Sequence, residues 1–291
     1  MRRPKGSCLM VAAAFLAMLP WGCAPSRDAV QPPRAASRPA GEAPRENEAE
    51  PEAPAQVRIA SDQPGREAPE PPPELEFHEM FPGVRADIAA RVIEFDARTS
   101  PLLVADPQAP NFYIETIVCL PDTREHESLL VSEIRPSHLH AALLAAGFVP
   151  GAPGLFKFEN NRFVPVDPTG DRLSVEFVFK GPDGAERAID PREWIAHHTT
   201  GALFGFDGPD DGRGWVFAGS IIRTGPTGAG VYEADGVGVV VGLCCFGSEV
   251  IAWSRAFSHD ASIDEPEWIA RFADMPAPET PVRVRLRLLS K

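Results

Sequence analysis

The chain has 291 residues, with 41 acidic and 28 basic side chains, and its formal net charge is −13. This balance argues against a nucleic-acid partner, because such a partner requires a basic face that displaces counterions from phosphates. It also argues against electrostatic docking on anionic lipid, which requires clustered lysine and arginine.

The N-terminal segment has the features of an export signal. Arg2, Arg3 and Lys5 precede an apolar run of twelve residues, 8–19. A basic region followed by an apolar core of this length is typical of a secretory signal peptide, which we expect to cover residues 1–22. A helix over this run would span roughly 18 Å, which is too short for a hydrocarbon core of about 30 Å. The pattern therefore predicts export and not a membrane-spanning helix.

Cys23 follows the apolar run and is a candidate lipidation site. Gly22 and Cys23 fit the end of a bacterial lipoprotein signal, whereas Pro20 and Trp21 depart from its usual pattern. Acyl chains such as palmitate on this cysteine would hold the protein at a membrane, since each buried CH₂ contributes about 0.8 kcal/mol. The sequence predicts a cell-envelope lipoprotein, with a freely secreted or periplasmic protein as the alternative.

Residues 23–75 are rich in proline, glutamate and alanine. They include twelve prolines and few large apolar side chains, so they cannot bury enough apolar surface to offset the entropy lost on ordering. We expect a disordered tether with extended, polyproline-like stretches. Residues 76–291 are long enough for one domain with a single sizeable core.

The 76–291 region is predicted to be rich in strands. Residues 172–180 alternate apolar and polar side chains, and the turn at 181–184 leads into a hairpin partner. Residues 282–288 alternate most clearly, with valine and leucine on one face and arginine on the other, which indicates one buried and one solvated face. Further strands are predicted over 111–120, 127–134, 185–189, 215–222, 237–246 and 249–253.

Two helices carry capping signals. Ser137 is the expected N-cap of the first helix, and Gly147 is expected to end it. Asp190 is the expected N-cap of the second, with Glu193 completing a capping box. A third, shorter helix is expected near 265–272.

Strands dominate this pattern, and the helices interrupt them irregularly. We therefore predict an α+β single domain, with a largely antiparallel or mixed β-sheet and two or three short helices. A disordered N-terminal segment precedes it.

Three cysteines lie within 76–291, namely Cys119, Cys244 and Cys245. They allow at most one intramolecular disulfide, between Cys119 and one of the adjacent pair, because side chains adjacent on a strand point to opposite faces. Their apolar neighbours favour buried free thiols instead. The sequence contains no CxxC and no spaced cysteine quartet, which argues against zinc-ribbon and iron–sulfur sites, and we expect no cofactor.

The densest group of potential metal-binding or acid–base side chains comprises His126, Glu127, Ser128, His138 and His140. His126-Glu127 begins like the zinc motif HExxH, but the second histidine of that motif is missing. His138 and His140 lie about 200° apart on the predicted helix, so they cannot chelate one ion together. Ser128 follows on a predicted strand, where neighbouring side chains diverge. These five residues form a candidate functional cluster, and no residue is assigned as catalytic, metal-binding or cofactor-binding.

An ordered series of motifs resembles the YdjY-like family of exported bacterial proteins. The central block is REHESLLV at 124–131 followed by RPSHLHAALL at 135–144, with Cys119-Leu120 before it. GWVFAGS at 214–220 and YEADG at 232–236 fit the same family. The resemblance covers most of residues 90–290. It implies one exported domain and supplies no particular reaction.

These observations lead to two functional hypotheses. The first is a non-catalytic exported envelope protein, a tethered module that binds an unknown protein, glycan or small ligand and reaches the membrane only through its lipid anchor. The alternative is a hydrolase or a metal-dependent site around His126, Glu127, His138 and His140. The alternative requires that at least three of these polar groups converge in one cleft.

Overall fold

The computed structural model describes residues 74–289, except for 107, 109–110, 206–212 and 226–227. The predicted signal peptide, the lipidation candidate Cys23 and nearly all of the predicted tether lie outside the described residues. Among the residues that are described, no helix is long and apolar enough to cross a membrane.

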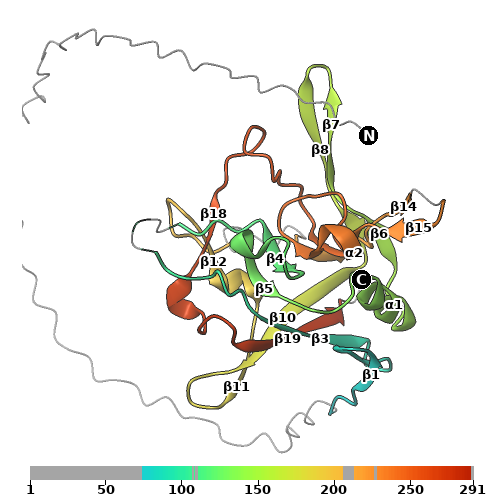
Figure 1. Ribbon diagram of the computed structural model, residues 1–291, viewed down its shortest axis with the longest axis vertical. Coiled ribbons are helices and arrows are strands. Elements are labelled where there is room, and N and C mark those ends of the chain that lie inside the picture. Colours follow the sequence, from blue (N-terminus) through green and yellow to red (C-terminus); the bar gives the residue numbers. More distant parts are fainter. Residues whose placement is uncertain (1–73, 107, 109–110, 206–212, 226–227, 290–291) are drawn as a thin grey trace, which may run out of the picture. The chain divides into compact units, whose positions relative to one another are not determined.

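The central feature of the described residues is a closed barrel of eight strands (Figure 1). Neighbouring strands are antiparallel except for two parallel pairs, β16 with β17 and β4 with β5. The ring closes because Arg98 and Thr99 pair with Val131 and Leu130. In order around the ring, the strands are β3 (Val92–Thr99), β19 (Pro281–Leu288), β10 (Arg172–Lys180), β13 (Trp215–Phe217), β17 (Ile251–Trp253), β16 (Val239–Gly242), β4 (Thr116–Cys119) and β5 (Ser128–Val131).

Two strands of the ring are long enough to hold two partners along one edge. β3 pairs with β2 (Val84–Asp87) over its first half and with β5 at its end. β10 likewise pairs with β13 at its start and with β11 (Glu186–Ile189) at its end. The sheet therefore continues beyond the ring, on the β3 side as far as β1 (His78–Phe81).

The alternation predicted for the C-terminal strand β19 is present, but its arginine face forms ion pairs across the sheet. Val282, Val284 and Leu286 are buried in the core. Between them, the guanidinium of Arg285 lies 2.6 Å from the carboxylate of Glu94 on β3, whose side chain is only 1% exposed. Cross-strand pairs of opposite charge contribute roughly 0.2–1 kcal/mol each. The face predicted to be solvated is therefore an ion-paired face of the sheet.

The first predicted helix is present as α1 (Pro136–Ala145). Its last carbonyls accept the backbone N–H groups of Gly147 and Phe148, and Gly147 has a φ of +82°, which is the geometry of a Schellman motif. The predicted N-cap is wrong, because Arg135 occupies that position and Ser137 lies inside the first turn.

The other two predicted helices are wrong. The Asp190 capping box is present, but it caps only the 3-10 turn η2 (Pro191–Trp194). The chain then extends as β12 (Ile195–His197). This strand pairs with β18 (Trp268–Ala270), which lies in the segment predicted as the third helix. Two segments expected to be helical therefore pair with each other as strands.

The fold is mostly β, and the predicted α+β domain with a largely antiparallel or mixed sheet and two or three short helices is wrong. Within the described residues, the α-helices are α1 and the single-turn α2 (Ala234–Val237). Closure of the ring decides the fold, and it depends on the pairing of β3 with β5. Alternation within a strand shows which face is buried, but it does not show which edges meet.

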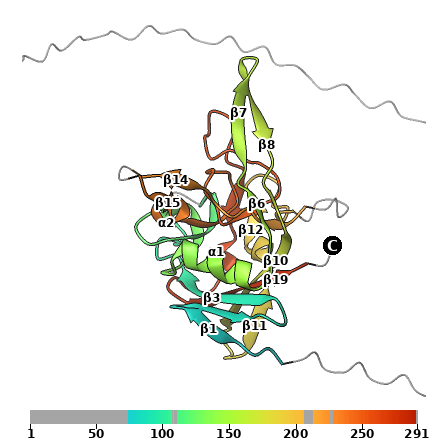
Figure 2. The same ribbon diagram turned by 90° about the vertical axis from the view of Figure 1, so that its right-hand side faces the viewer.

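Small hairpins and turns complete the described residues. The hairpin of β7 and β8 projects from the rest of the fold (Figure 2). These elements are β6 (Pro150–Ala152) with β9 (Thr169–Gly170), β7 (Leu155–Glu159) with β8 (Arg162–Val166), β14 (Ile222–Thr224) with β15 (Gly230–Tyr232), η1 (Glu125–Glu127) and η3 (Phe272–Asp274).

Candidate functional site

The first three residues of the predicted cluster have different surroundings in the structure. His126 is largely exposed on η1, and its Nε2 lies 3.6 Å from a carboxylate oxygen of Glu127. Glu127 is ion-paired with Arg124 at 2.6 Å. Ser128 is fully buried at the start of β5, where its hydroxyl donates to the carbonyl of Leu130 at 2.9 Å. This hydroxyl is therefore already used by the backbone.

The two histidines of α1 have other partners. The ring of His138 stacks on Phe81 of β1, with centroids 4.5 Å apart. His140 Nδ1 lies 2.8 Å from the hydroxyl of Tyr232, which itself donates to the carbonyl of Gly219 at 3.1 Å. Burial lowers the pKa of His140 and raises the pKa of Tyr232.

The predicted cluster therefore does not converge on one site. No contact among the described residues joins His126 or Glu127 to His138 or His140. Within the same residues, no group of three or more His, Cys, Asp or Glu side chains is arranged to hold a metal ion.

Asp235 of α2 stabilises the start of α1. Asp235 accepts the backbone N–H and the hydroxyl of Ser137, each at 2.8 Å, and it pairs with Arg135 at 2.8 Å. Asp235 thus supplies from another element the cap that Ser137 was predicted to provide. We call Arg135, Ser137, His140, Tyr232 and Asp235 the α1 corner.

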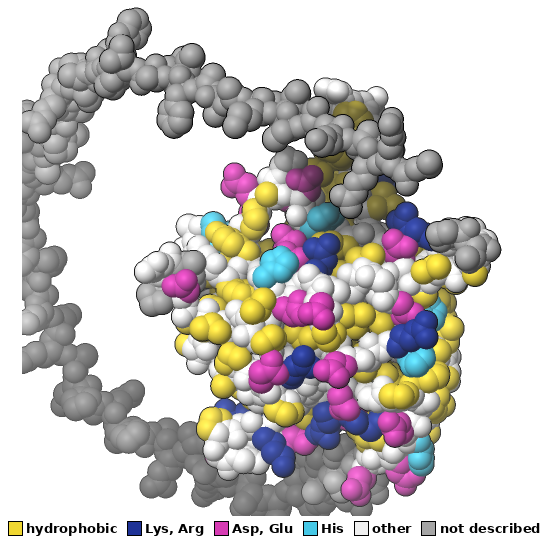
Figure 3. Space-filling model, viewed as in Figure 1, with side chains coloured by type: hydrophobic (Ala, Val, Ile, Leu, Met, Phe, Trp, Pro, Cys, Tyr) yellow, Lys and Arg dark blue, Asp and Glu magenta, His cyan; other side chains and the backbone are white. Residues whose placement is uncertain are grey.

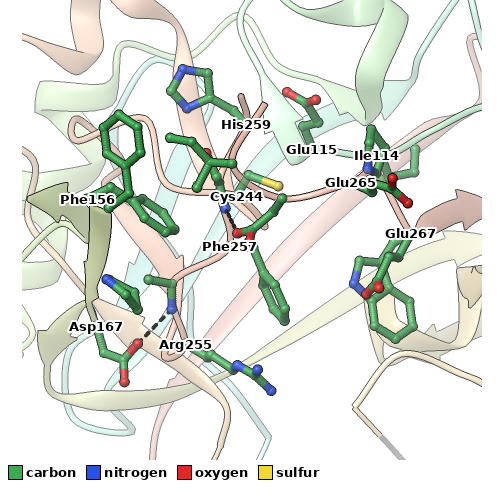
Figure 4. Close-up of a pocket in the computed structure, with 18 of the residues that line it drawn as sticks. Ile114, Glu115, Phe156, Asp167, Cys244, Arg255, Phe257, His259, Glu265 and Glu267 are labelled. Atoms are coloured by element: carbon green, nitrogen blue, oxygen red, sulfur yellow. Dashed lines mark hydrogen bonds between the residues drawn. The ribbon is translucent and has the colours of Figure 1, made fainter. Parts of the chain in front are cut away.

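A cavity with a volume of about 1040 Å³ lies elsewhere in the described residues (Figure 4). We call it the cleft. Its lining comes from the start of β4, from one face of the β7–β8 hairpin and from the chain between β17 and β18. Figure 4 shows Glu115, Glu265 and Glu267 on one side, with Asp167 and Arg255 on the other. The lining residues are 114–115, 156, 163, 165, 167, 213, 244, 254–259 and 263–268.

A pair of carboxyl groups lies at one end of the cleft. Glu115 lines the cavity and hydrogen-bonds Glu127, and its backbone N–H donates to the Glu127 carbonyl at 3.0 Å. Burial and then the neighbouring Glu127 raise the pKa of Glu115 to about 7, against the lowering effect of Arg124. A carboxyl of this kind donates or accepts a hydrogen bond near neutral pH, depending on what approaches it. Of the five residues predicted, Glu127 is the one that reaches this pair.

Cys244 lies beside this pair on the cleft lining. Its backbone N–H donates to the Glu115 carbonyl at 2.8 Å. Burial and the nearby carboxylates raise the pKa of the thiol well above its ordinary value, so it stays protonated and is a poor nucleophile. Cys119, Cys244 and Cys245 are all free and buried. This confirms the interpretation of buried thiols over a disulfide.

The chain between β17 and β18 forms one wall of the cleft, and hydrogen bonds hold it in place. Asp167 accepts the N–H of Ala256 at 2.8 Å, and Asp264 accepts the N–H of Ser258 at 2.7 Å. His259 Nδ1 donates to the carbonyl of Cys245 at 2.8 Å. These hydrogen bonds hold the wall in place, so the polar atoms that form them are already paired within the protein.

The β7–β8 hairpin presents an aromatic face to the cleft. Phe158 is opposite Phe163 and Phe156 is opposite Pro165, so these four side chains share one face. Phe156, Phe163 and Pro165 line the cleft, whereas Phe158 lies farther out and is 64% exposed. An exposed apolar face that continues into a cavity marks a binding surface.

Sequence reasoning missed Glu115 and the hairpin. Glu115 lies inside the apolar run 111–120, where a single acidic residue is an exception that deserved a reason. The hairpin has a turn signal in Asn160-Asn161, both with positive φ, flanked by alternating phenylalanines. Neither signal shows by itself that the two segments meet at one cavity.

The comparison with known families bears on all of these segments. The chain matches the family model described as the YdjY domain over residues 84–287. The chain belongs to the YdjY family. Searches of curated proteins and of solved structures gave no match.

The segments on which the resemblance rests fall into two places in this YdjY domain. The α1 block at 135–144 meets the 232–236 segment in the α1 corner through Asp235 and Tyr232. The 124–131 block contributes Arg124 and Glu127 to the carboxyl pair behind the cleft. The family model therefore identifies the domain. The geometry shows that its motif residues lie in two different places, the α1 corner and the region behind the cleft.

Proposed function

We propose that this protein is a non-catalytic binding module of the cell envelope whose ligand occupies the cleft. In this proposal, residues 1–22 direct export, Cys23 carries the lipid and residues 23–75 hold the domain away from the membrane. The partner is a protein segment, a glycan or a small ligand of the envelope.

The cleft is the observation that carries this proposal. Ligand sites typically enclose about 300–1,000 Å³ and combine apolar walls with a few polar groups. The cavity of about 1040 Å³ slightly exceeds the upper end of that range. Its wall is rigid, because Phe257 and Trp268 pack on the buried ring of Phe204, with centroids 6.2 and 4.7 Å away. A preformed wall reduces the ordering cost of binding.

Three observations favour binding over catalysis. The Ser128 hydroxyl is bonded to the backbone, the Cys244 thiol is held protonated, and the histidines of the predicted cluster are apart. The surface supports a partner other than nucleic acid. Figure 3 shows Lys and Arg side chains interspersed with Asp and Glu over the described part of one face, without a continuous basic patch.

Ligand binding at the cleft is tested with two matched tryptophan variants of the full-length protein. Pro266 is exposed and lines the cleft, whereas Pro278 is exposed and lies outside its lining. Ligand-observed NMR with a library of neutral, anionic and cationic aromatic fragments should give hits that Pro266→Trp weakens and Pro278→Trp does not. A library in which no hit responds to Pro266→Trp would overturn the binding function.

The anchor is tested separately by mass spectrometry of the mature N-terminus. The wild-type chain should begin at Cys23 with acyl mass added and should fractionate with membranes. Cys23→Ser should release a soluble exported protein. An unmodified wild-type chain that begins at another residue would exclude lipidation and leave a freely secreted or periplasmic protein.

A further inference from the structure

The charges that line the cleft differ in how far the protein itself satisfies them. Asp167 and Asp264 each accept a backbone N–H of the wall. Glu265 and Glu267 are exposed, and no described residue forms an ion pair with either carboxylate. With Glu115, which is influenced by the charge of Arg124, they place three carboxyl groups on one side of the cavity, and Arg255 lies on the other side.

Aromatic rings line the same cavity as these carboxyl groups. Trp268 and Phe257 form part of its wall. The outer side is covered by Phe156 and Phe163 of the hairpin. A cation over an aromatic face is attracted by the negative charge of the ring's π-face. Carboxylates beside aromatic rings are therefore a suitable environment for an organic cation that carries an apolar part.

The cleft already contains one example of this contact. The guanidinium of Arg255 lies 5.2 Å from the ring centroid of Phe257, on the side away from Glu115 in Figure 4. An anionic ligand would have to approach the three carboxyl groups and a chain with a net charge of −13. A cationic ligand is attracted by both, and this attraction raises its association rate.

We propose that the cleft binds a ligand with a primary amine or guanidinium group next to an apolar part. Glu115, Glu265 and Glu267 receive the cation, and the aromatic face of the β7–β8 hairpin covers the apolar part. This proposal rests on the proposed binding function and specifies its ligand class. The cation comes from a lysine or arginine side chain of a peptide, or from a free polyamine.

Matched probes test the charge directly by isothermal titration calorimetry with the full-length protein. N-acetyl-phenylalanyl-arginine amide is compared with the same peptide carrying citrulline, which keeps the size of arginine and removes its charge. The arginine probe should bind at least tenfold more tightly, about 1.4 kcal/mol. The lysine peptide tests the amine, and spermidine tests a cation without an aromatic part.

A pair of variants tests the residues. Glu265→Gln/Glu267→Gln should reduce the preference for arginine over citrulline to less than about threefold, since exposed pairs contribute only modest energies each. Glu159→Gln in the hairpin turn is the control. It removes one exposed negative charge, where the double variant removes two, and Glu159 lies outside the cleft lining. It should leave the preference unchanged.

The outcomes separate the two proposals. Equal affinities for the arginine and citrulline probes, or no binding of either, would overturn the cationic ligand class. Fragment hits that respond to Pro266→Trp would then still support the binding function. Spermidine binding as tight as that of the arginine peptide would support the cation but assign it to a polyamine.

Discussion

The α1 corner and the cleft are two polar regions of the same domain that differ in what their polar groups contact. In the α1 corner, Asp235 serves Arg135 and Ser137, and His140, Tyr232 and Gly219 form a closed chain of hydrogen bonds. In the cleft, Glu265 and Glu267 line a cavity and form no ion pair with any described residue. Polar residues that satisfy one another build structure, whereas exposed carboxylates that line a cavity without an ion-pair partner are available to a ligand.

This comparison also explains why residue type alone pointed to the wrong place. The α1 histidines are chemically versatile, but both are used in packing, one on Phe81 and one on Tyr232. Glutamates are common on surfaces and attract less attention. Their significance here comes from the cavity they share with aromatic rings.

Removing the cap of the α1 corner should have the largest effect. Asp235→Ala deprives one backbone N–H, one hydroxyl and one guanidinium of their partner. We expect a loss of about 2–3 kcal/mol in the free energy of unfolding, measured by urea denaturation. Asp274→Ala is the control, since Asp274 forms an exposed pair with Arg271 and should cost less than about 0.5 kcal/mol. Equal losses for the two variants would show that Asp235 contributes no more to stability than an exposed ion pair does.

The two described tyrosines provide a second, smaller test. Tyr232→Phe removes the hydroxyl that bonds both His140 and the Gly219 carbonyl in a partly buried place, and should cost about 1–2 kcal/mol. Tyr113 bonds His198 at 3.0 Å, but this contact is exposed. Tyr113→Phe should therefore change the unfolding free energy by less than about 0.5 kcal/mol. If the two variants lose the same unfolding free energy, the Tyr232 hydroxyl does not stabilise the α1 corner.

The two regions should respond to pH with opposite signs. Folding raises the pKa of Glu115 from about 4.5 to about 7, so the folded state binds more protons in this window and becomes less stable as pH rises through it. Folding lowers the pKa of His140, so its contribution is present above about 6.5 and is lost as pH falls below that value.

Glu115→Gln isolates the cleft side of this difference. It should be more stable relative to wild type at pH 8 than at pH 4.5 by about 1 kcal/mol, a value reduced for the partial exposure of the site. Unfolding free energies at the two pH values measure it. A difference that does not change with pH would mean that Glu115 titrates normally.

The smallest effect on stability is expected in the cleft itself. Glu265→Gln/Glu267→Gln should change the unfolding free energy by less than about 0.5 kcal/mol, because neither carboxylate has an ion-pair partner among the described residues. Thermal and urea unfolding measure this. A loss above about 1 kcal/mol would show that these side chains support the fold, and the comparison between the two regions would fail.

Local signals predicted some elements well. β10 has the predicted bounds, and β19 begins one residue before its predicted segment and ends with it. The end of α1 at Gly147 follows from glycine's access to positive φ. The capping box at Asp190 also forms, but the residues after Trp194 gain more from pairing with β18 than from continuing a helix. Local propensity is weak enough for tertiary pairing to override it.

The sequence by itself predicted the family, seven of the eight strands of the ring, the single long helix and the free state of the cysteines in their apolar surroundings. Only the tertiary structure decided that the sheet closes and that Glu115 meets Glu127. It also decided that Glu265 and Glu267 share a cavity with the hairpin more than a hundred residues earlier. The physical reason is range: burial patterns and caps act over a few residues, whereas edge pairing and cavity formation depend on segments that meet only when the chain has folded.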